Sequence, residues 1–519
     1  MKSKNPVLQL FYCLFVAFLV LVICSRSSFL YPFNIWDDAN GFLTMGKSMI
    51  HGMVPYRDLF EPKGILLYVL YAVGYLISHT TFAGVFVIEV IAAGAVLFFA
   101  MQILIMYVEE QTACILLPIF AALVYSSRSF YWGGSAEEFM LPYLMCGLYV
   151  LLRHISTNPM RPMSLQDVAC GGFCAGCILH IKFNSLGFYI GWVIAVSLII
   201  LVANEEHRFW VLVQSAAAFL AGVLVITVPF AVYFGIHGAI GDWFRCCIYD
   251  NVFIYSKSLP LGERILQMCR TIFNQTMYNK RFMIPIAAGL ILDLVMAVMK
   301  RDRRENLVLA SDFLTCTLLA VGIFVGGIDL PYYPFPVSIF AVIGFARGGV
   351  LLEMAWEELL KKHEKVSRER RDKDGIALIG AAAAAVAVAA AVFICFFGSP
   401  NAGDIGTKQE DLFQFKMRKY ILAQGIEDPK LINMGLFDAG LYTVLDSVPE
   451  CYYYQTTTMP IPGVWETQKE YVKSGRPDYV LSTIGYLDFN TSGYRVVMQE
   501  QDDSTGVVTD YWLYEKIRE

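Results

Sequence analysis

Long apolar segments recur along the first three quarters of the chain and alternate with short polar connections. A helix that crosses a membrane needs about 20 mainly apolar residues, with a lower limit of about 17. Eleven segments come near this length, and we expect each to span the membrane: 8–27, 84–106, 112–126, 138–152, 168–182, 185–203, 209–234, 282–299, 307–327, 331–351 and 376–397. The pattern predicts an all-α polytopic membrane domain over residues 1–397.

One further apolar segment, 64–79, is too short for a span. Its uncharged part, Ile65 to Ile77, would be roughly 20 Å long at 1.5 Å per residue, against a bilayer core of about 30 Å. Tyr68, Tyr71 and Tyr75 share one helical face, and tyrosine favours the boundary between lipid and water. We therefore expect a helix on the outer membrane surface, with a second surface helix near 39–51. The alternative is that 64–79 is a short span and another segment is re-entrant.

Composition supports a membrane protein, since 57% of the 519 residues are hydrophobic and only 16% are charged. Soluble domains average about 45–50% apolar and about 25% charged residues. The net charge of −5 lacks the basic excess of a nucleic-acid-binding protein, so we expect no nucleic-acid partner. The chain also lacks a glycine-rich phosphate loop, which argues against direct use of ATP.

Basic residues predict the orientation, because Lys and Arg near short loops stay on the cytoplasmic side. They gather at Lys300–Arg304, in the stretch 353–374 that includes Arg368, Arg370 and Arg371, and at Arg153. Eleven spans with these loops inside put the N-terminus in the cytoplasm. The same count puts the C-terminal 120 residues outside the cell membrane.

The first outer loop, 28–83, carries an unusual set of charges, beginning with the pair Asp37-Asp38. Carboxylates at a membrane boundary are costly unless they are solvated or paired, so several together indicate a polar site. There are also structural interpretations. Asp37 could cap a surface helix, and Asp58 and Glu61 could form surface salt bridges with Arg57 and Lys63.

Four motifs in this order resemble a known family. They are Trp36-Asp37-Asp38, Gly52-x-x-Pro55-Tyr56-x-Asp58-Leu59-Phe60, Glu61-x-Lys63-Gly64 and Gly133-Gly134-Ser135-Ala136-Glu137-Glu138-Phe139. Together they resemble the polytopic glycosyltransferases of the C type. More narrowly, they resemble bacterial members of the group related to protein mannosyltransferases and lipid A aminoarabinose transferase. The resemblance covers roughly residues 1–350. The lipid A enzymes have Glu-Lys-Pro where this chain has Glu61-Pro62-Lys63-Gly64, which leaves the roles of Glu61 and Lys63 open.

The resemblance implies inverting transfer of one sugar from a polyprenyl phosphate donor to a cell-surface glycan, lipid or protein. An acceptor hydroxyl needs a general base, and Asp37 or Asp38 is the candidate. The departing lipid phosphate needs cations, and the candidates are Lys63, Arg57, Arg128 and Lys182. Lys182 could instead be a lysine whose head reaches the membrane interface. The expected cofactor is none, with weak assistance by a divalent cation left open.

Further polar residues are expected to support the site: Asp58, Glu61, Glu137, Glu138 and Asn184. One of Glu137 and Glu138 could merely stabilise the N-terminus of the next span through the helix dipole. No metal site is predicted. Cys174-x-x-Cys177 with His180 has suitable spacing, but it lies in an apolar span rich in glycine, where close helix packing is the better interpretation.

The composition changes after residue 397, and residues 398–519 are polar with short apolar runs. Strands are predicted at 431–436, 451–455, 479–483, 494–499 and 511–516, with helices near 438–446 and 463–474. We expect a small extracytoplasmic α/β domain. Tyr452, Tyr453, Tyr454 and Trp465 could stack on sugars, although such aromatics more often belong to a core.

The leading hypothesis is a membrane glycosyltransferase. A transporter or lipid flippase is the main alternative, and would be expected to carry ionisable residues midway through broken spans. Such residues are few here, Glu89 being one exception. An oligosaccharide polymerase or ligase is a third possibility, which would move a sugar chain instead of one sugar.

Overall fold

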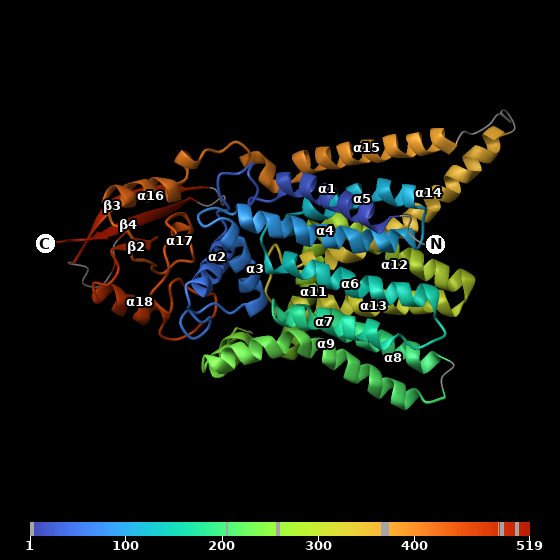
Figure 1. The fold of residues 1–519 in the computed structure, drawn as a ribbon, viewed down its shortest axis with the longest axis horizontal. Coiled ribbons are helices and arrows are strands. Elements are labelled where there is room, and N and C mark those ends of the chain that lie inside the picture. Colours follow the sequence, from blue (N-terminus) through green and yellow to red (C-terminus); the bar gives the residue numbers. More distant parts are fainter. Residues whose placement is uncertain are drawn as a thin grey trace.

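The structure of the protein is a computed structural model. It consists of a long helical bundle with an α/β region at one end (Figure 1). The described residues are 5–203, 206–255, 260–364, 373–485, 487, 493–503 and 508–518, without the side chains of 359–364 and 373–378. Nine helices in these residues are long and apolar enough to cross a membrane. These candidate spans correspond to the helices α1 (Pro6–Cys24), α4 (Ala83–Ile105), α6 (Ala136–Thr157), α8 (Gly187–Val202), α9 (Arg208–Ile236), α12 (Lys280–Lys300), α13 (Arg303–Phe324), α14 (Ala341–Glu364) and α15 (Lys373–Gly398).

The two other predicted spans are helices as well, although they are shorter. They form α5 (Glu110–Tyr125) and α7 (Leu165–Leu179), which lie in the same bundle (Figure 1). All eleven predicted segments are therefore helical, and the predicted class of a polytopic membrane protein with a small C-terminal sheet is confirmed.

The two ends of the bundle differ in what they carry. The start of α1 and the connections α6–α7 and α12–α13 lie at one end, and the α/β region lies at the other (Figure 1). The basic residues Arg153 and Lys300–Arg304 thus lie at the same end as the start of α1. Arg368, Arg370 and Arg371 lie outside the described residues.

Helices α2 (Asp37–Ile50) and α3 (Ile65–Ile77) lie between the bundle and the α/β region. Tyr68, Tyr71 and Tyr75 of α3 are buried, so the prediction that they face the lipid boundary is wrong. They pack against α2 and the loops around it, and the hydroxyl of Tyr68, for example, donates to the Glu61 carbonyl at 2.8 Å. The exposed side chains of α3 are Leu76 and Ile77 at its end, with Val73.

The connection between α9 and α12 is mostly helical. It contains α10 (Ile240–Phe244), a π-helix at Arg245–Ile254 and α11 (Leu261–Tyr278). The π-helix supplies Cys247, Ile248 and Asn251 to a cavity described below.

The C-terminal region contains a four-stranded sheet of order β1-β2-β4-β3. Its strands are β1 (Leu431–Asn433), β2 (Tyr479–Ser482), β3 (Tyr494–Asp502) and β4 (Thr509–Lys516), and its helices are α16 (Phe413–Ala423), α17 (Leu441–Val444) and α18 (Val464–Lys473). Strands β1 and β2 are parallel, while β4 is antiparallel to both of its neighbours. The strand predicted at 451–455 is wrong. There, the Tyr452 carbonyl accepts the Phe60 N–H at 3.0 Å, and the Tyr454 carbonyl accepts the N–H of Asn433 in β1 at 3.3 Å. The segment therefore lies between the loop before α3 and the sheet without forming a strand.

Buried polar contacts join α2 to the α/β region. Thr44 donates to Asp438 at 2.6 Å, and Thr443 donates to Asn40 at 2.9 Å. The Lys47 side chain is 1% exposed and donates to the Tyr442 carbonyl. Buried polar groups are stable only with such partners, so these contacts fix the α/β region on α2.

Charges within the bundle are more numerous than Glu89 alone. Arg347 of α14 lies 2.6 Å from Asp293 of α12 and 2.7 Å from Glu305 of α13. The two carboxylates offset the free-energy cost of burying the arginine charge. This cluster therefore joins three helices.

Candidate active site

The acidic pair opens helix α2. Trp36 is the residue before the helix, and the Asp37 carboxylate accepts the backbone N–H of Asp38 at 2.9 Å. Negative charge is favourable in the first turn of a helix. The helix begins at Asp37 itself and has no side-chain cap, so the interpretation of Asp37 as the cap of a helix starting near Ala39 is wrong. Both carboxylates lie at the end of the bundle next to the α/β region.

Asp38 faces Lys63 and the connection before α14. Its Oδ2 atom lies 4.0 Å from Lys63 Nζ and accepts a hydrogen bond from the Tyr332 hydroxyl at 3.3 Å. Lys63 Nζ also lies 3.8 Å from Glu61 Oε1. Burial acts to lower the pKa of Lys63, but the Asp38 and Glu61 carboxylates more than offset it and raise that pKa above its ordinary value. Lys63 is therefore a fixed positive charge.

Glu61 is held from the α/β region. Gln455 Nε2 donates to Glu61 Oε2 at 2.9 Å, and Gln455 Oε1 accepts the Asp438 N–H at 2.8 Å. Burial raises the pKa of Glu61 to about 7 in spite of Lys63. The orientation of Glu61 thus depends on the docked α/β region.

Lys182, like Lys63, is a half-buried cation at this end. It forms a salt bridge with Glu137, and its Nζ lies 3.9 Å from the centre of the Tyr333 ring. Lys63 and Lys182 line one cavity, which we call the Lys63 cavity. Its other walls are largely apolar and include Leu179, Ile181, Phe183, Ile248, Tyr255, Tyr333 and Met459.

Asp37 lines a different cavity, which we call the Asp37 cavity. It lies between the loops at this end of the bundle and the α/β region, and its lining includes Tyr131, Trp132, Gln414, Gly435, Thr456, Asp502 and Tyr511. Burial, and next the neighbouring Asp38 carboxylate, raise the pKa of Asp37 to about 7. A carboxyl group with this pKa can exchange a proton near neutral pH.

The remaining supporting residues have separate positions. Glu138 Oε2 accepts the Gly134 N–H at 2.8 Å just before α6, and both Glu137 and Glu138 stand in the first turn of that helix. Asn184 accepts a weak hydrogen bond from Ser185 at 3.4 Å. It lies two residues beyond Lys182 in the turn before α8.

Three predicted residues lie elsewhere. Arg57 pairs with Asp58 at 2.8 Å and also donates to the His237 carbonyl at 3.1 Å. Arg128 is exposed and packs over the Tyr278 ring. Neither arginine lines the Lys63 cavity or the Asp37 cavity, and the Arg57–Asp58 pair matches the surface salt bridge that was the alternative interpretation.

Sequence reasoning missed Tyr332, Tyr333 and Gln455. The two tyrosines stand in the segment 331–351, which the apolar pattern assigns to a span, and their only sequence signal is their position at its outer end. Gln455 lies almost 400 residues from Glu61, its partner. No local pattern could have joined them.

Cys174 has close neighbours, but they differ from those that its motif suggests. Its Sγ and those of Cys146 and Cys170 lie within 4.8 Å of one another, the one such group of three potential metal ligands in the described part of the chain. Cys177 and His180 do not belong to it. The motif spacing therefore does not describe a site.

Comparison with solved structures identifies the fold. ArnT from Cupriavidus metallidurans, bound to undecaprenyl phosphate, matches with a TM-score of 0.61 and 14% sequence identity over 98% of this chain and 97% of that chain. The chain has the C-type glycosyltransferase fold. The same ArnT in the apo state matches with a TM-score of 0.59 and 14% identity over the same shares.

The oligosaccharyltransferase AglB from Archaeoglobus fulgidus also matches, with a TM-score of 0.47 and 12% identity over 93% of this chain and 70% of that chain. No protein-family model and no curated protein sequence matches the chain. The match to ArnT confirms the fold that the motif resemblance implies.

Proposed function

We propose that this protein is a membrane glycosyltransferase that transfers a sugar from a polyprenyl phosphate to an acceptor at the outer membrane face. The observation that carries the proposal is the gathering of Asp37, Lys63 and Lys182 at one end of the bundle. A carboxylate and two cations there serve the two halves of a glycosyl transfer. The undecaprenyl phosphate in the ArnT structure of the same fold supports the choice of donor.

Asp37 is the proposed general base. It takes the proton of the acceptor hydroxyl, whose oxygen then forms a bond to the anomeric carbon of the sugar. Asp37 is preferred over Asp38 because it lines an open cavity, whereas Asp38 is engaged by Lys63 and Tyr332. Asp38 is the proposed positioning group for Lys63.

The leaving group departs in the same step. The bond between the anomeric carbon and the phosphate oxygen breaks, and its electron pair stays on the phosphate. Lys63 and Lys182 hold the resulting charge in the proposal, which assigns no ligand to a metal ion. A single displacement inverts the anomeric carbon. The apolar walls of the Lys63 cavity, such as Leu179 and Ile248, suit the first isoprene units of the lipid.

The orientation follows from the same proposal. The basic connections and the N-terminus face the cytoplasm, and the α/β region lies outside. The domains are then a transferase domain, 1–397, and an extracytoplasmic domain, 398–519. Cysteine accessibility at exposed Cys269, in α11, tests this arrangement. We expect a membrane-impermeant maleimide to label it from outside intact cells.

The function is tested with purified protein and a panel of radiolabelled polyprenyl-phosphate sugars, offered with membrane extract as acceptor. We expect transfer of one sugar per acceptor from at least one donor, and none from nucleotide sugars. Transfer of a preassembled sugar chain would instead support a ligase. Lipid movement across vesicles without any transfer would support a flippase and refute the proposal.

A pH profile tests the assignment of the base. Asp37 must be ionised to act as a base. Because its pKa is raised to about 7, the single-turnover rate should rise about tenfold per pH unit below pH 7 and level off above pH 7. Asp38→Asn removes a negative charge that raises this pKa, so the midpoint should move to lower pH. Glu61→Gln should leave a rising limb in place. A profile that loses this limb in Glu61→Gln would assign the titration to Glu61 and contradict the account.

A further inference from the structure

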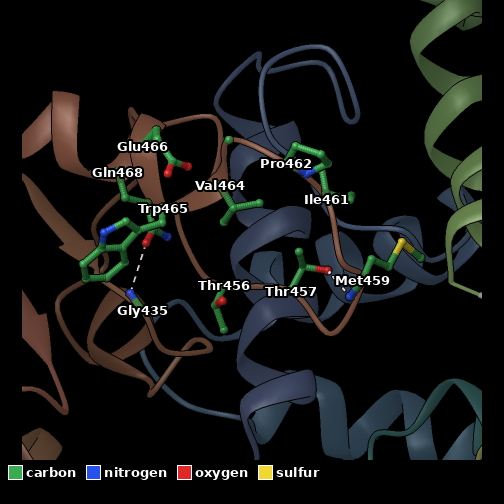
Figure 2. Close-up of a pocket in the computed structure, with 11 residues that line it drawn as sticks. Gly435, Thr456, Thr457, Met459, Ile461, Pro462, Val464, Trp465, Glu466 and Gln468 are labelled. Carbon is green, nitrogen blue, oxygen red and sulfur yellow. Dashed lines mark hydrogen bonds between the residues drawn. The ribbon is translucent and has the colours of Figure 1, made fainter.

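A shallow cavity on the α/β region adjoins the proposed site. Trp465 and Glu466, at the start of α18, form one side, and Thr457 and Met459 form the other, with Thr456 between them (Figure 2). We call it the Trp465 cavity. Glu466 is exposed, and Trp465, Thr456 and Thr457 are half-buried.

This cavity shares residues with both cavities of the proposed site. Gly435 and Thr456 line the Trp465 cavity and the Asp37 cavity. Met459 lines the Trp465 cavity and the Lys63 cavity. An extended ligand that lies over Trp465 can therefore continue past Thr456 to Asp37.

The aromatic wall is held in place before any ligand binds. Gly435 has a φ of +74°, and a Cβ there would lie 3.0 Å from the Trp465 ring, so the indole packs closely on bare backbone. The Gly435 N–H donates to Gln468 Oε1 at 3.0 Å, and Gln468 Nε2 donates to the Tyr453 carbonyl at 2.9 Å. A fixed wall loses little conformational entropy on binding.

The mixture of groups fits one chemical class. A pyranose ring has an apolar face of C–H groups, which packs on an indole, and a rim of hydroxyls, which bond to carboxylate and hydroxyl oxygens. Trp465 offers the flat face, and Glu466 and Thr457 offer the polar partners. We propose that the Trp465 cavity is an acceptor subsite for a sugar ring of a glycan whose reacting hydroxyl lies at Asp37.

The residues that the cavities share favour the acceptor, and not the donor, as the ligand of the Trp465 cavity. The donor phosphate is proposed to lie between Lys63 and Lys182, where its lipid remains against the bundle. The Trp465 cavity lies on the α/β region and meets the Asp37 cavity through two residues, but meets the Lys63 cavity through Met459 alone. This assignment rests on the proposed function.

The binding test uses the full chain in lipid nanodiscs on an array of microbial surface glycans, each present with and without its lipid. We expect the parent and Asp37→Asn to bind the same glycans, in either form. Trp465→Ala should weaken binding roughly tenfold or more, while Trp465→Phe keeps most of it. Trp210→Ala, an exposed tryptophan of α9, is the matched control. Binding of no glycan, or only of lipid-linked forms, overturns the proposal.

The kinetic test separates this inference from the function itself. Trp465→Ala should raise the half-saturating acceptor concentration roughly tenfold, with the rate at saturating acceptor and the binding of undecaprenyl phosphate unchanged. Transfer that is insensitive to Trp465→Ala overturns the subsite and leaves the function intact. Glycan binding that depends on Trp465, in a protein without transferase activity, overturns the function and retains the sugar site.

Discussion

Asp37→Asn is expected to reduce the single-turnover rate of sugar transfer by roughly 10²–10⁴-fold, the usual contribution of a general base. Asparagine has nearly the shape of aspartate, and its side-chain oxygen can still accept the Asp38 N–H, as Asp37 does at 2.9 Å. Helix α2 should therefore begin as before. Undecaprenyl phosphate should bind with unchanged affinity, because Lys63 and Lys182 are untouched.

The matched control is Asp58→Asn, the same substitution in the same outer loop. Asp58 pairs with exposed Arg57 and lines neither cavity, so the rate should stay within about threefold of the parent. An Asp37→Asn protein that keeps the parental rate would remove Asp37 from the chemistry. A large loss in Asp38→Asn alone, with normal phosphate binding, would transfer the role to Asp38.

Lys63→Met is expected to weaken binding of undecaprenyl phosphate by roughly 30-fold or more, about 2 kcal/mol. This is the lower range for removing one member of a buried charge pair. The measurement is isothermal titration of the lipid into protein in nanodiscs. Lys63→Arg keeps the charge and should lose far less affinity.

Interpretation of the Lys63→Met result needs two controls. Lys63→Met leaves Asp38 and Glu61 without their cation, at 4.0 Å and 3.8 Å in the parent, so thermal unfolding must show that the variant is folded. Lys408→Met changes an exposed lysine outside the site and should bind as the parent does. Equal affinity in the parent and in a folded Lys63→Met protein would place the phosphate elsewhere.

The span pattern predicted most of the fold because membrane length and backbone hydrogen bonding allow few arrangements. Length alone separates the short segment 64–79 from the spans, and this segment forms α3 between the bundle and the α/β region. Its tyrosines were misassigned because the α/β region and the loops around α2 cover that face. A local pattern carries no information about residues far along the chain that pack over that face. One of them is Asp446, 371 residues later, whose carboxylate accepts a hydrogen bond from the Tyr75 hydroxyl at 3.0 Å.

The sequence predicts only part of the candidate site, because motifs and topology do not give the direction of side chains. Asp37, Asp38, Glu61 and Lys63 belong to one loop, so motif order alone brought them together. Lys182 joined them through the predicted topology, which placed it at the outer face. Charge type and topology could not exclude Arg57 or Arg128, because both are basic and both lie at that end, and side-chain direction decides which cations enter the cavity.

Phosphate binding between the two lysines can be seen directly in a cryo-EM structure of the full chain in nanodiscs with saturating undecaprenyl phosphate. The account predicts phosphate density between Lys63 Nζ and Lys182 Nζ, with the lipid leaving along the apolar wall of the Lys63 cavity and Asp37 facing the open side. An empty Lys63 cavity, or a phosphate bound at the opposite end of the bundle, would contradict it.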